Sequence, residues 1–273
     1  MFRKTVSAFI FVVFSLSTYA EGSGLKLYVF NCGSIKMPSV EAFGIKDSET
    51  DVRELVVPCY IIEHAKGRLL WDGGLPSSVA DNDGYDENGG RIDKTFAEQI
   101  KALNLNMGSF DFVSFSHFHY DHIGIANEIS GAKLIIQKPE YEAAFAEKVT
   151  VPYFSPELYS GLKDAEATII EGDYDVFGDG SVQLISAYGH TPGHQVLYLD
   201  LPNYGPLILS GDLYHFRLSR TDRRVPSFNY DAEMSLKAMD KVEGLIVERK
   251  AEFWIEHDMA LFKTLKTAPA YYD

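Results

Sequence analysis

Hydrophobic positions along this chain form short runs separated by polar turns, and most of these runs have the length of a β-strand. Strands are predicted at residues 27–30, 55–62, 69–71, 112–115, 182–185, 196–199, 207–209 and 253–255. Helical spacing predicts helices at residues 95–103, around 143–145 and at 232–247. Strands come first, and strands and helices alternate afterwards. Without an internal repeat or a linker, this order favours one layered α/β domain.

The first twenty residues differ from the rest of the chain. Arg3 and Lys4 precede an apolar run from Val6 to Leu16, and small residues near Ala20 suit cleavage by a signal peptidase. The run is shorter than the about 20 apolar residues that a membrane-spanning helix needs. We therefore interpret residues 1–20 as a cleaved secretory signal and residues 21–273 as one domain. We expect a periplasmic or secreted protein without membrane attachment.

Composition and charge narrow the range of partners. Of the 273 residues, 46% are hydrophobic and 23% are charged, as in an ordinary globular protein. The net charge is −14, and loss of Arg3 and Lys4 with the secretory signal would make it −16. Such acidity repels a phosphate backbone, which disfavours nucleic acid as a partner. Cys32 and Cys59 lie on separate predicted strands, and their sequence positions fit a disulfide and two buried thiols equally well.

The histidines cluster at the ends of predicted strands. His117, His119, Asp121 and His122 follow the strand at 112–115 within six residues. His117 and His119 lie two positions apart, so they share one face of an extended backbone. A helix beginning at Asp121 would turn the other two side chains toward a neighbouring point. Imidazole and carboxylate ligands favour zinc or a similar ion over calcium or magnesium.

Three further candidate ligands follow predicted strands much later in the chain. They are His190, Asp212 and His257. Their strand ends can converge on the first cluster, and a carboxylate such as Asp212 has two oxygens with which to bridge two metal ions. A lone histidine at such a position is usually an ordinary hydrogen-bonded residue. The recurrence of the pattern at seven positions nevertheless predicts a metal site.

The seven residues resemble the ligand pattern of the metallo-β-lactamase superfamily. Its H-x-H-x-D-H motif matches 117–122, and its later His, Asp and His match the three distant candidates. Asp72 in Trp71-Asp72-Gly73-Gly74 resembles the strand-ending Asp of the family, whose implied role is to orient a ligand histidine. The resemblance implies a four-layer αββα sandwich with mixed sheets and the site at one edge.

The resemblance also implies two zinc ions and a hydrolytic reaction. One ion would be held by His117, His119 and His190, the other by Asp121, His122 and His257, and Asp212 would bridge them. Two such ions share a hydroxide that forms near neutral pH and can attack an ester-like carbonyl. Asp121 would pass a proton to the leaving oxygen, so it is a candidate catalytic residue.

Within the superfamily, the chain resembles the N-acyl homoserine lactonases. It has a long section before His117 and a short one after His257. Many of these lactonases carry a Tyr three residues after the bridging Asp, and that position holds His215 here, with Tyr214 beside it. His215 is therefore the second candidate catalytic residue, and Tyr214 is the alternative. The alternative functions are hydrolysis of another ester, a thioester as in glyoxalase II or a β-lactam, followed by a non-catalytic metal-binding protein.

Other residues have simpler interpretations. His194 lies outside the seven-residue pattern and is expected to be a turn residue or a partner of a ligand, and His64 is expected to be solvated beside a turn. The spacing of Asp81, Asp83 and Asp86 only faintly resembles a calcium loop, so a solvated loop is the default. Five aromatic residues either line an acyl pocket or pack in the core. They are Tyr141, Phe145, Tyr153, Phe154 and Tyr159.

Overall fold

The computed structural model describes residues 24–273, so the predicted secretory signal lies outside the described residues. The strands are β1 (Lys26–Lys36), β2 (Glu54–His64), β3 (Gly67–Trp71), β4 (Gly90–Arg91), β5 (Phe112–Ser114), β6 (Lys133–Gln137), β7 (Ala167–Ile170), β8 (Tyr174–Asp175), β9 (Val182–Ser186), β10 (Gln195–Leu201), β11 (Gly205–Leu209) and β12 (Glu252–Trp254). The α-helices are α1 (Phe96–Gln99), α2 (Lys138–Ala144), α3 (Pro156–Tyr159), α4 (Arg217–Asp222), α5 (Ala232–Arg249) and α6 (Met259–Phe262).

The strands form two mixed sheets. The first has the order β4-β1-β2-β3-β5-β6-β7, and the second has the order β12-β11-β10-β9-β8. In the first sheet, β3, β5, β6 and β7 run parallel, whereas β1, β2 and β3 are antiparallel neighbours. In the second sheet, β11 and β12 are the parallel pair. Parallel neighbours end at the same edge of a sheet, which places the loops after them side by side.

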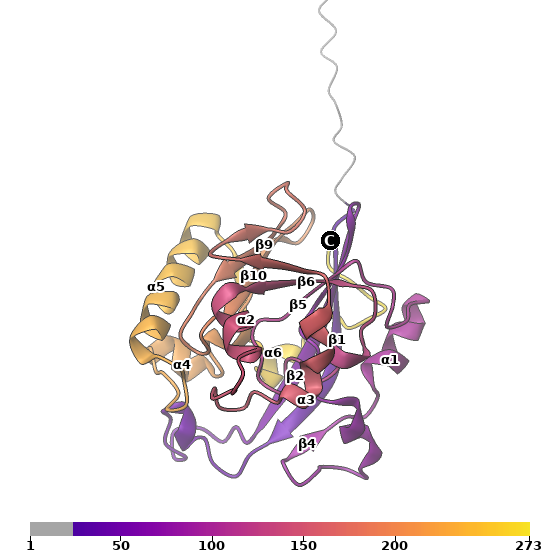
Figure 1. Ribbon diagram of the computed structural model, residues 1–273. Coiled ribbons are helices and arrows are strands. Elements are labelled where there is room, and N and C mark those ends of the chain that lie inside the picture. Colours follow the sequence, from indigo (N-terminus) through magenta and orange to yellow (C-terminus); the bar gives the residue numbers. More distant parts are fainter. Residues whose placement is uncertain (1–23) are drawn as a thin grey trace, which may run out of the picture.

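Alternation of side chains along the strands builds three stacked cores. Leu69 and Trp71 of β3 pack against the second sheet, whereas Leu70 faces the helical layer that contains α1 and α2. On β11, Leu209 joins the core between the sheets and Ile208 packs under α5. Figure 1 shows α5 and α1 on opposite sides of the molecule with the strands between them. The predicted four-layer αββα sandwich is confirmed.

Residues at its two ends determine where the long helix α5 begins and stops. The Asp231 side chain accepts a hydrogen bond from Met234 N at 2.7 Å, which satisfies an amide that the helix leaves unpaired. Buried residues recur at helical spacing and cover the second sheet, and the chain leaves the helix at Lys250 in a left-handed conformation. The predicted helix at 232–247 therefore extends to Arg249.

Some details differ from the sequence prediction. The pattern did not predict β6, β7 or β8, and the polar segment 81–92 contains β4, which pairs with β1. The helix expected to begin at Asp121 is instead a turn, with His122 N bonded to His119 O at 3.0 Å. In the polar loop, Asp86 Oδ1 accepts backbone bonds from Asn88 and Gly90, so this carboxylate shapes a turn.

The solvated state expected for His64 is wrong. Its side chain is only 2% exposed and lies 3.0 Å from Asp179 through Nε2. The ring also stacks on Phe177 with 4.2 Å between the centroids. The turn between β8 and β9 therefore covers the turn between β2 and β3.

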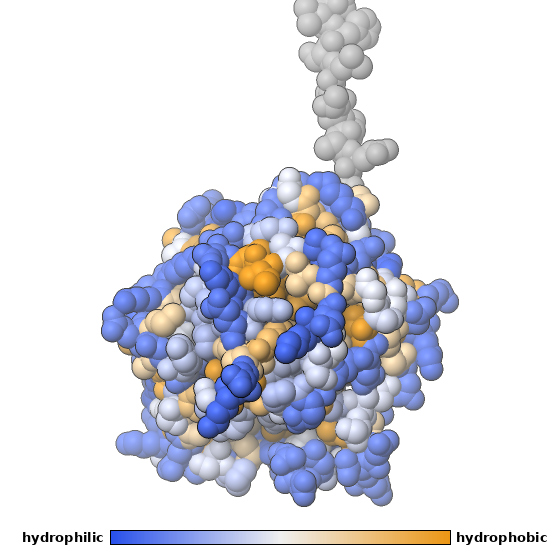
Figure 2. All heavy atoms as spheres, in the orientation of Figure 1, coloured by the Kyte–Doolittle hydropathy of each residue, from blue (hydrophilic) through white to orange (hydrophobic). Residues whose placement is uncertain are grey.

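Cys32 and Cys59 form a disulfide that joins β1 and β2. This settles the alternative that the sequence left open. The face of the molecule seen in Figure 2 is mostly hydrophilic, with hydrophobic residues in separate patches, as expected for an acidic globular chain. Within residues 24–273, none of the helices combines the length and hydrophobicity needed to cross a bilayer.

Candidate metal centre

The seven predicted ligand side chains lie together at one end of the sandwich. The segment 117–122 follows β5, while His190, Asp212 and His257 follow β9, β11 and β12. Both sheets therefore contribute, and every contributing loop leaves the carboxyl end of a strand. All seven residues are buried, with exposures of 9% or less.

Three histidines form a first group around one oxygen of Asp212. His190 Nε2 lies 3.2 Å from His117 Nε2 and 3.1 Å from His119 Nδ1. Asp212 Oδ2 lies 3.1 Å from His190 Nε2 and 3.6 Å from His117 Nε2. One ligand atom from each of these four residues lies within 4.8 Å of the others. A single ion can therefore reach all four.

Asp121, His122 and His257 form a second group around the other oxygen. Asp212 Oδ1 lies 2.9 Å from His257 Nε2 and 3.4 Å from His122 Nε2. Asp121 Oδ2 lies 3.8 Å from His257 Nε2 and 3.7 Å from His122 Nε2. The two carboxylate oxygens of Asp212 thus face different groups, which is the arrangement of a bridging ligand.

Unpaired buried atoms in this cluster fit divalent metal ions. His122 Nε2 and Asp212 Oδ1 are buried and make no hydrogen bond, although Asp212 Oδ1 lies 2.9 Å from His257 Nε2. Buried polar atoms are nearly always paired, so unpaired atoms that converge call for a ligand. In the first group, three imidazole nitrogens face one another, which suits a shared cation better than a set of hydrogen bonds. Histidine and carboxylate donors together suit zinc and similar ions.

The two groups differ in protonation. Burial lowers the pKa of His117 and of His119 well below the usual range, and neighbouring imidazoles lower both further. Burial also opposes a charge on His122, but three nearby carboxylates, with Asp212 the strongest, raise its pKa well above the usual value. In the same way, Asp212 outweighs burial and raises the pKa of His257 to about 9. His117 and His119 therefore favour the neutral state, whereas His122 and His257 favour a protonated state whose protons a metal ion must displace.

The other ring nitrogen of most of these histidines has a fixed partner. His122 Nδ1 lies 3.0 Å from Asp72 Oδ2, and Asp72 Oδ1 accepts from Ser116 N at 2.6 Å. His257 Nδ1 donates to the carbonyl of Val56 at 2.7 Å. Such partners fix the tautomer and orientation of a ligand histidine. Asp72 thus lies where it can orient His122.

A cavity of about 190 Å³ opens beside the cluster. Asp121, Asp212 and His215 line its polar side. Its apolar wall consists of Ile35, Met37, Ala42, Phe43, Leu55, Tyr153 and Phe228. A small polar group can therefore reach the centre while an apolar chain contacts the wall.

Residues 52–249 match the family model of the metallo-beta-lactamase superfamily. The chain belongs to this superfamily. Its metallo-hydrolase fold and buried histidine and aspartate cluster, which can hold metal, agree with that membership.

Curated members of this superfamily match nearly the whole chain. N-acyl homoserine lactonase AttM of Rhizobium johnstonii is 30% identical over 265 residues, covering 91% of this chain and 98% of the relative. The AttM lactonase of Azorhizobium caulinodans is 29% identical over 265 residues, covering 91% and 99%. The chain is therefore similar to the lactonase branch of the superfamily.

A solved structure of an N-acyl homoserine lactone hydrolase, with N-hexanoyl-L-homoserine at its catalytic metal center, superposes with a TM-score of 0.76. It is 26% identical and covers 90% of this chain and 98% of the other. A Bacillus thuringiensis AiiA mutant with N-decanoyl-L-homoserine at its active site superposes equally well, at the same identity and coverage. The metallo-β-lactamase fold is thus shared with enzymes whose structures hold lactone-derived products.

His215 and Tyr214 are neighbours in the chain, but their side chains have different surroundings. His215 lines the cavity, and its Nε2 lies 2.8 Å from Asp212 Oδ2. Tyr214 is buried and packs against Phe253 behind the site, with 5.9 Å between the centroids. His194 also turns away from the cavity, because its two ring nitrogens bond to Asp212 N and Ala187 O.

Of the five aromatic candidates, Tyr153 lines the cavity. Phe154 and Tyr159 are buried in the core around Phe118, and Tyr141 and Phe145 pack against it. These four residues therefore pack in or against the core, and Tyr153 belongs to the cavity beside the metal-ligand cluster.

Two residues that hold the metal-ligand histidines or their loops in place were not predicted from the sequence. Asn229 Oδ1 lies 2.9 Å from His190 Nδ1 and belongs to the loop before α5. The buried Glu140 of α2 accepts bonds from Phe118 N, Thr191 Oγ1 and Gly193 N at 2.7–2.8 Å. It ties the loop of His117 and His119 to the loop of His190. Neither residue belongs to a local motif, so no sequence pattern could have found them.

Proposed function

We propose that this chain is a dinuclear zinc hydrolase that opens the lactone ring of N-acyl homoserine lactones. The observation that carries the proposal is the position of Asp212, whose two oxygens face separate ligand groups beside an apolar-walled cavity. The lactonase relatives that cover nine-tenths of the chain support this substrate class.

In this proposal, seven side chains hold two ions. His117, His119 and His190 would hold one, Asp121, His122 and His257 would hold the other, and Asp212 would contribute one oxygen to each. A bound pair of divalent ions supplies Lewis acidity and lowers the pKa of water toward about 7. The mixed set of imidazole and carboxylate donors supports zinc.

Asp121 and His215 are the proposed catalytic residues. Asp121 is the more accessible carboxylate, with 12% of its side chain exposed, and it lines the cavity. It takes a proton from the attacking water and returns it to the ring oxygen when the carbon–oxygen bond of the lactone breaks. His215 lines the cavity, with its Nε2 2.8 Å from Asp212 Oδ2, and from this position it would donate a hydrogen bond to the substrate carbonyl.

The cavity supports a substrate with a polar head and an apolar tail. Phe43 and Phe228 lie 5.3 Å apart in an edge-to-face arrangement, and each contacts His215. An acyl chain that packs on these rings is removed from water, and each buried methylene contributes about 0.8 kcal/mol. The lactone ring would then lie at the polar side of the cavity.

We further propose that the enzyme works outside the cytoplasm. The basic start and apolar run of residues 1–20 support secretion. The disulfide between Cys32 and Cys59 supports an oxidising compartment, because such bonds persist there.

A substrate panel on the zinc-loaded protein tests the function. Proton release is followed with N-hexanoyl and N-decanoyl homoserine lactone, a cephalosporin and a glutathione thioester, each with and without a chelator. We expect chelator-sensitive opening of the lactones to be fastest. Faster thioester or cephalosporin hydrolysis would assign another substrate class. Two bound zinc ions without turnover of any substrate would favour a metal-binding protein without activity.

A further inference from the structure

The disulfide lies directly against the turn that carries Asp72. This turn, Asp72-Gly73-Gly74-Leu75, follows β3. A Cβ atom on Gly74 would lie 2.3 Å from Cys32 Cβ and 3.0 Å from Cys59 Sγ, so the turn has no spare room on this side. Leu75 N also donates to the carbonyl of Cys32 at 3.3 Å. The turn therefore packs directly against the disulfide.

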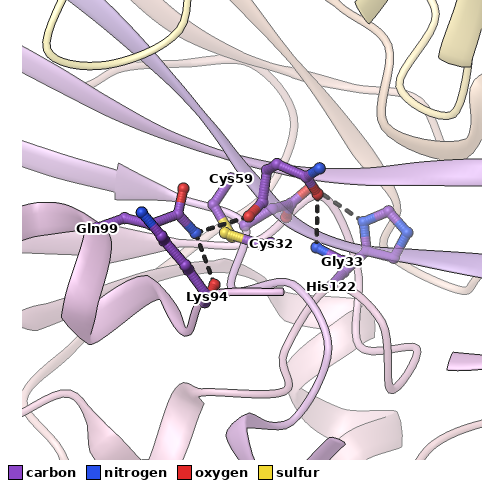
Figure 3. Close-up of a disulfide and its surroundings, with 8 residues drawn as sticks. Cys32, Gly33, Cys59, Lys94, Gln99 and His122 are labelled. Atoms are coloured by element: carbon purple, nitrogen blue, oxygen red, sulfur yellow. Dashed lines mark hydrogen bonds and ion pairs between the residues drawn. A yellow bond between two sulfur atoms is a disulfide. The ribbon is translucent and has the colours of Figure 1, made fainter. Parts of the chain in front are cut away.

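The opposite side of the same turn holds His122. Gly73 N donates to His122 O at 2.5 Å, and Gly124 N donates to Gly74 O at 2.8 Å. The Asp72 carboxylate lies 3.0 Å from His122 Nδ1. Figure 3 shows Cys32 and Cys59 bonded, with Gly33 and His122 beside them. The turn thus connects the disulfide to the imidazole of the second ligand group.

The backbone of this turn needs support from both sides. Asp72 has φ of 57° and Gly74 has φ of 62°, both in the left-handed region. For a residue with a side chain, that conformation costs roughly 1–2 kcal/mol, so neighbouring contacts must maintain it at Asp72. One of these neighbours is the segment of β1 around Cys32.

That segment of β1 is not held by a regular strand ladder. The register between β1 and β2 shifts between Asn31 and Ser34, so Cys32 lies in an irregularity of the pairing. The disulfide joins β1 to β2 at this point, and both cysteines are at most 3% exposed. Without the bond, the two sulfurs move apart to van der Waals contact, and the adjacent Gly74 must shift.

We propose that the Cys32–Cys59 disulfide is a positioning element for the metal centre, which sets metal affinity at the second ligand group through Asp72 and His122. The inference rests on the proposed function, because it takes His122 as a metal ligand. An oxidised protein holds the second ion tightly, whereas a chain without the bond loses affinity mainly at that position.

The test uses the mature chain and two variants that lack the bond, C32A/C59A and C32S/C59S. Zinc affinity is measured by competition with a chelator, and the ion at the second ligand group is identified by its loss in H257A. We expect both variants to weaken this ion by about 10- to 100-fold, the range typical when support of a ligand is lost. The other ion should change less than threefold. Absorption of the cobalt-substituted protein should change for one of the two sites.

Three further variants separate positioning from general stability. In a D72A background, loss of the disulfide should no longer weaken the second ion, because the connection is already broken. G74A keeps the disulfide but forces the turn away from it, so it should weaken the same ion. V242A truncates a buried side chain in the core under α5, far from the turn, and should leave both affinities unchanged while lowering the melting temperature.

The outcomes distinguish the inference from the function on which it rests. Unchanged affinities in both cysteine variants would overturn the inference, as would an equal loss at both positions or an undiminished loss in the D72A background. If the cysteine variants do not fold, G74A decides, and normal affinity there would overturn the inference. A wild-type chain that binds fewer than two zinc ions would instead refute the proposed function.

Discussion

The two ligand groups on either side of Asp212 are built differently. In the first group, burial and neighbouring imidazoles lower the pKa values of His117 and His119, so these two rings favour the neutral state. The second group pairs His122 and His257 with carboxylates that favour protonated rings. One fold thus prepares two metal positions in different ways. At the first position, His117 and His119 are available as neutral donors, whereas at the second a cation must replace the protons of His122 and His257.

The supports of the two groups differ as well. The His190 ring contacts Asn229 through Nδ1. Glu140 connects the loop of His190 to the loop of His117 and His119. The His122 ring contacts Asp72, and the turn that carries Asp72 packs against the disulfide. Damage to one support should therefore affect one ligand group more than the other.

Loss of Asp212 should have the largest effect, because both groups share it. We expect D212A to lose both ions and to reduce kcat/KM by more than the 10- to 100-fold that loss of a supporting partner causes. Metal analysis and lactone hydrolysis provide the measurement, with D200N on the exposed part of β10 as the control. Retention of one tightly bound ion would show that the groups do not depend on a shared carboxylate.

Single ligand losses should separate the groups. We expect H190A to lose the ion of the first group and H257A to lose that of the second, so each variant retains about one zinc per chain. Cobalt spectra of the two variants should differ, because the retained ligands differ. Identical spectra would contradict two separate positions.

Removal of a supporting partner should produce a smaller and selective loss. N229A leaves His190 Nδ1 without its partner at 2.9 Å, so affinity at the first group should fall by about tenfold. D72A should have the same effect at the second group. Competition titrations of both variants check this, and equal weakening of both ions by either substitution would count against independent supports.

Glu140 should make stability depend on pH. Burial raises its pKa to about 7, although its three hydrogen bonds act in the opposite direction. The folded state therefore binds more protons than the unfolded state between about pH 4.5 and 7. As the pH rises through this window, the free energy of unfolding should therefore fall by at most about 1.4 kcal/mol per pH unit. E140Q lacks this contribution, so urea unfolding of the metal-free proteins should show a shallower slope for E140Q than for wild type. Parallel curves would refute the role of Glu140.

Local patterns were sufficient to predict one layered α/β domain and the seven clustered residues at strand ends, whereas the four-layer arrangement was predicted from the family resemblance. Strands such as β9 and β11 are short apolar runs, and each candidate ligand follows one directly. Residues whose role depends on distant contacts could not be found in this way. Glu140 receives bonds from segments 22 and 53 residues away in the chain. The prediction for His64 used only the neighbouring turn residues. The side chain is covered by Phe177 and Asp179, which belong to a turn more than 100 residues later.

The most direct test of a dinuclear centre is a crystal structure of the zinc-loaded protein with anomalous data at the zinc edge. We expect two zinc peaks, one on each side of the Asp212 carboxylate. The first should contact His117, His119 and His190, and the second should contact Asp121, His122 and His257. A single peak, or an Asp212 carboxylate that contacts neither ion, would contradict a dinuclear centre shared by the two ligand groups.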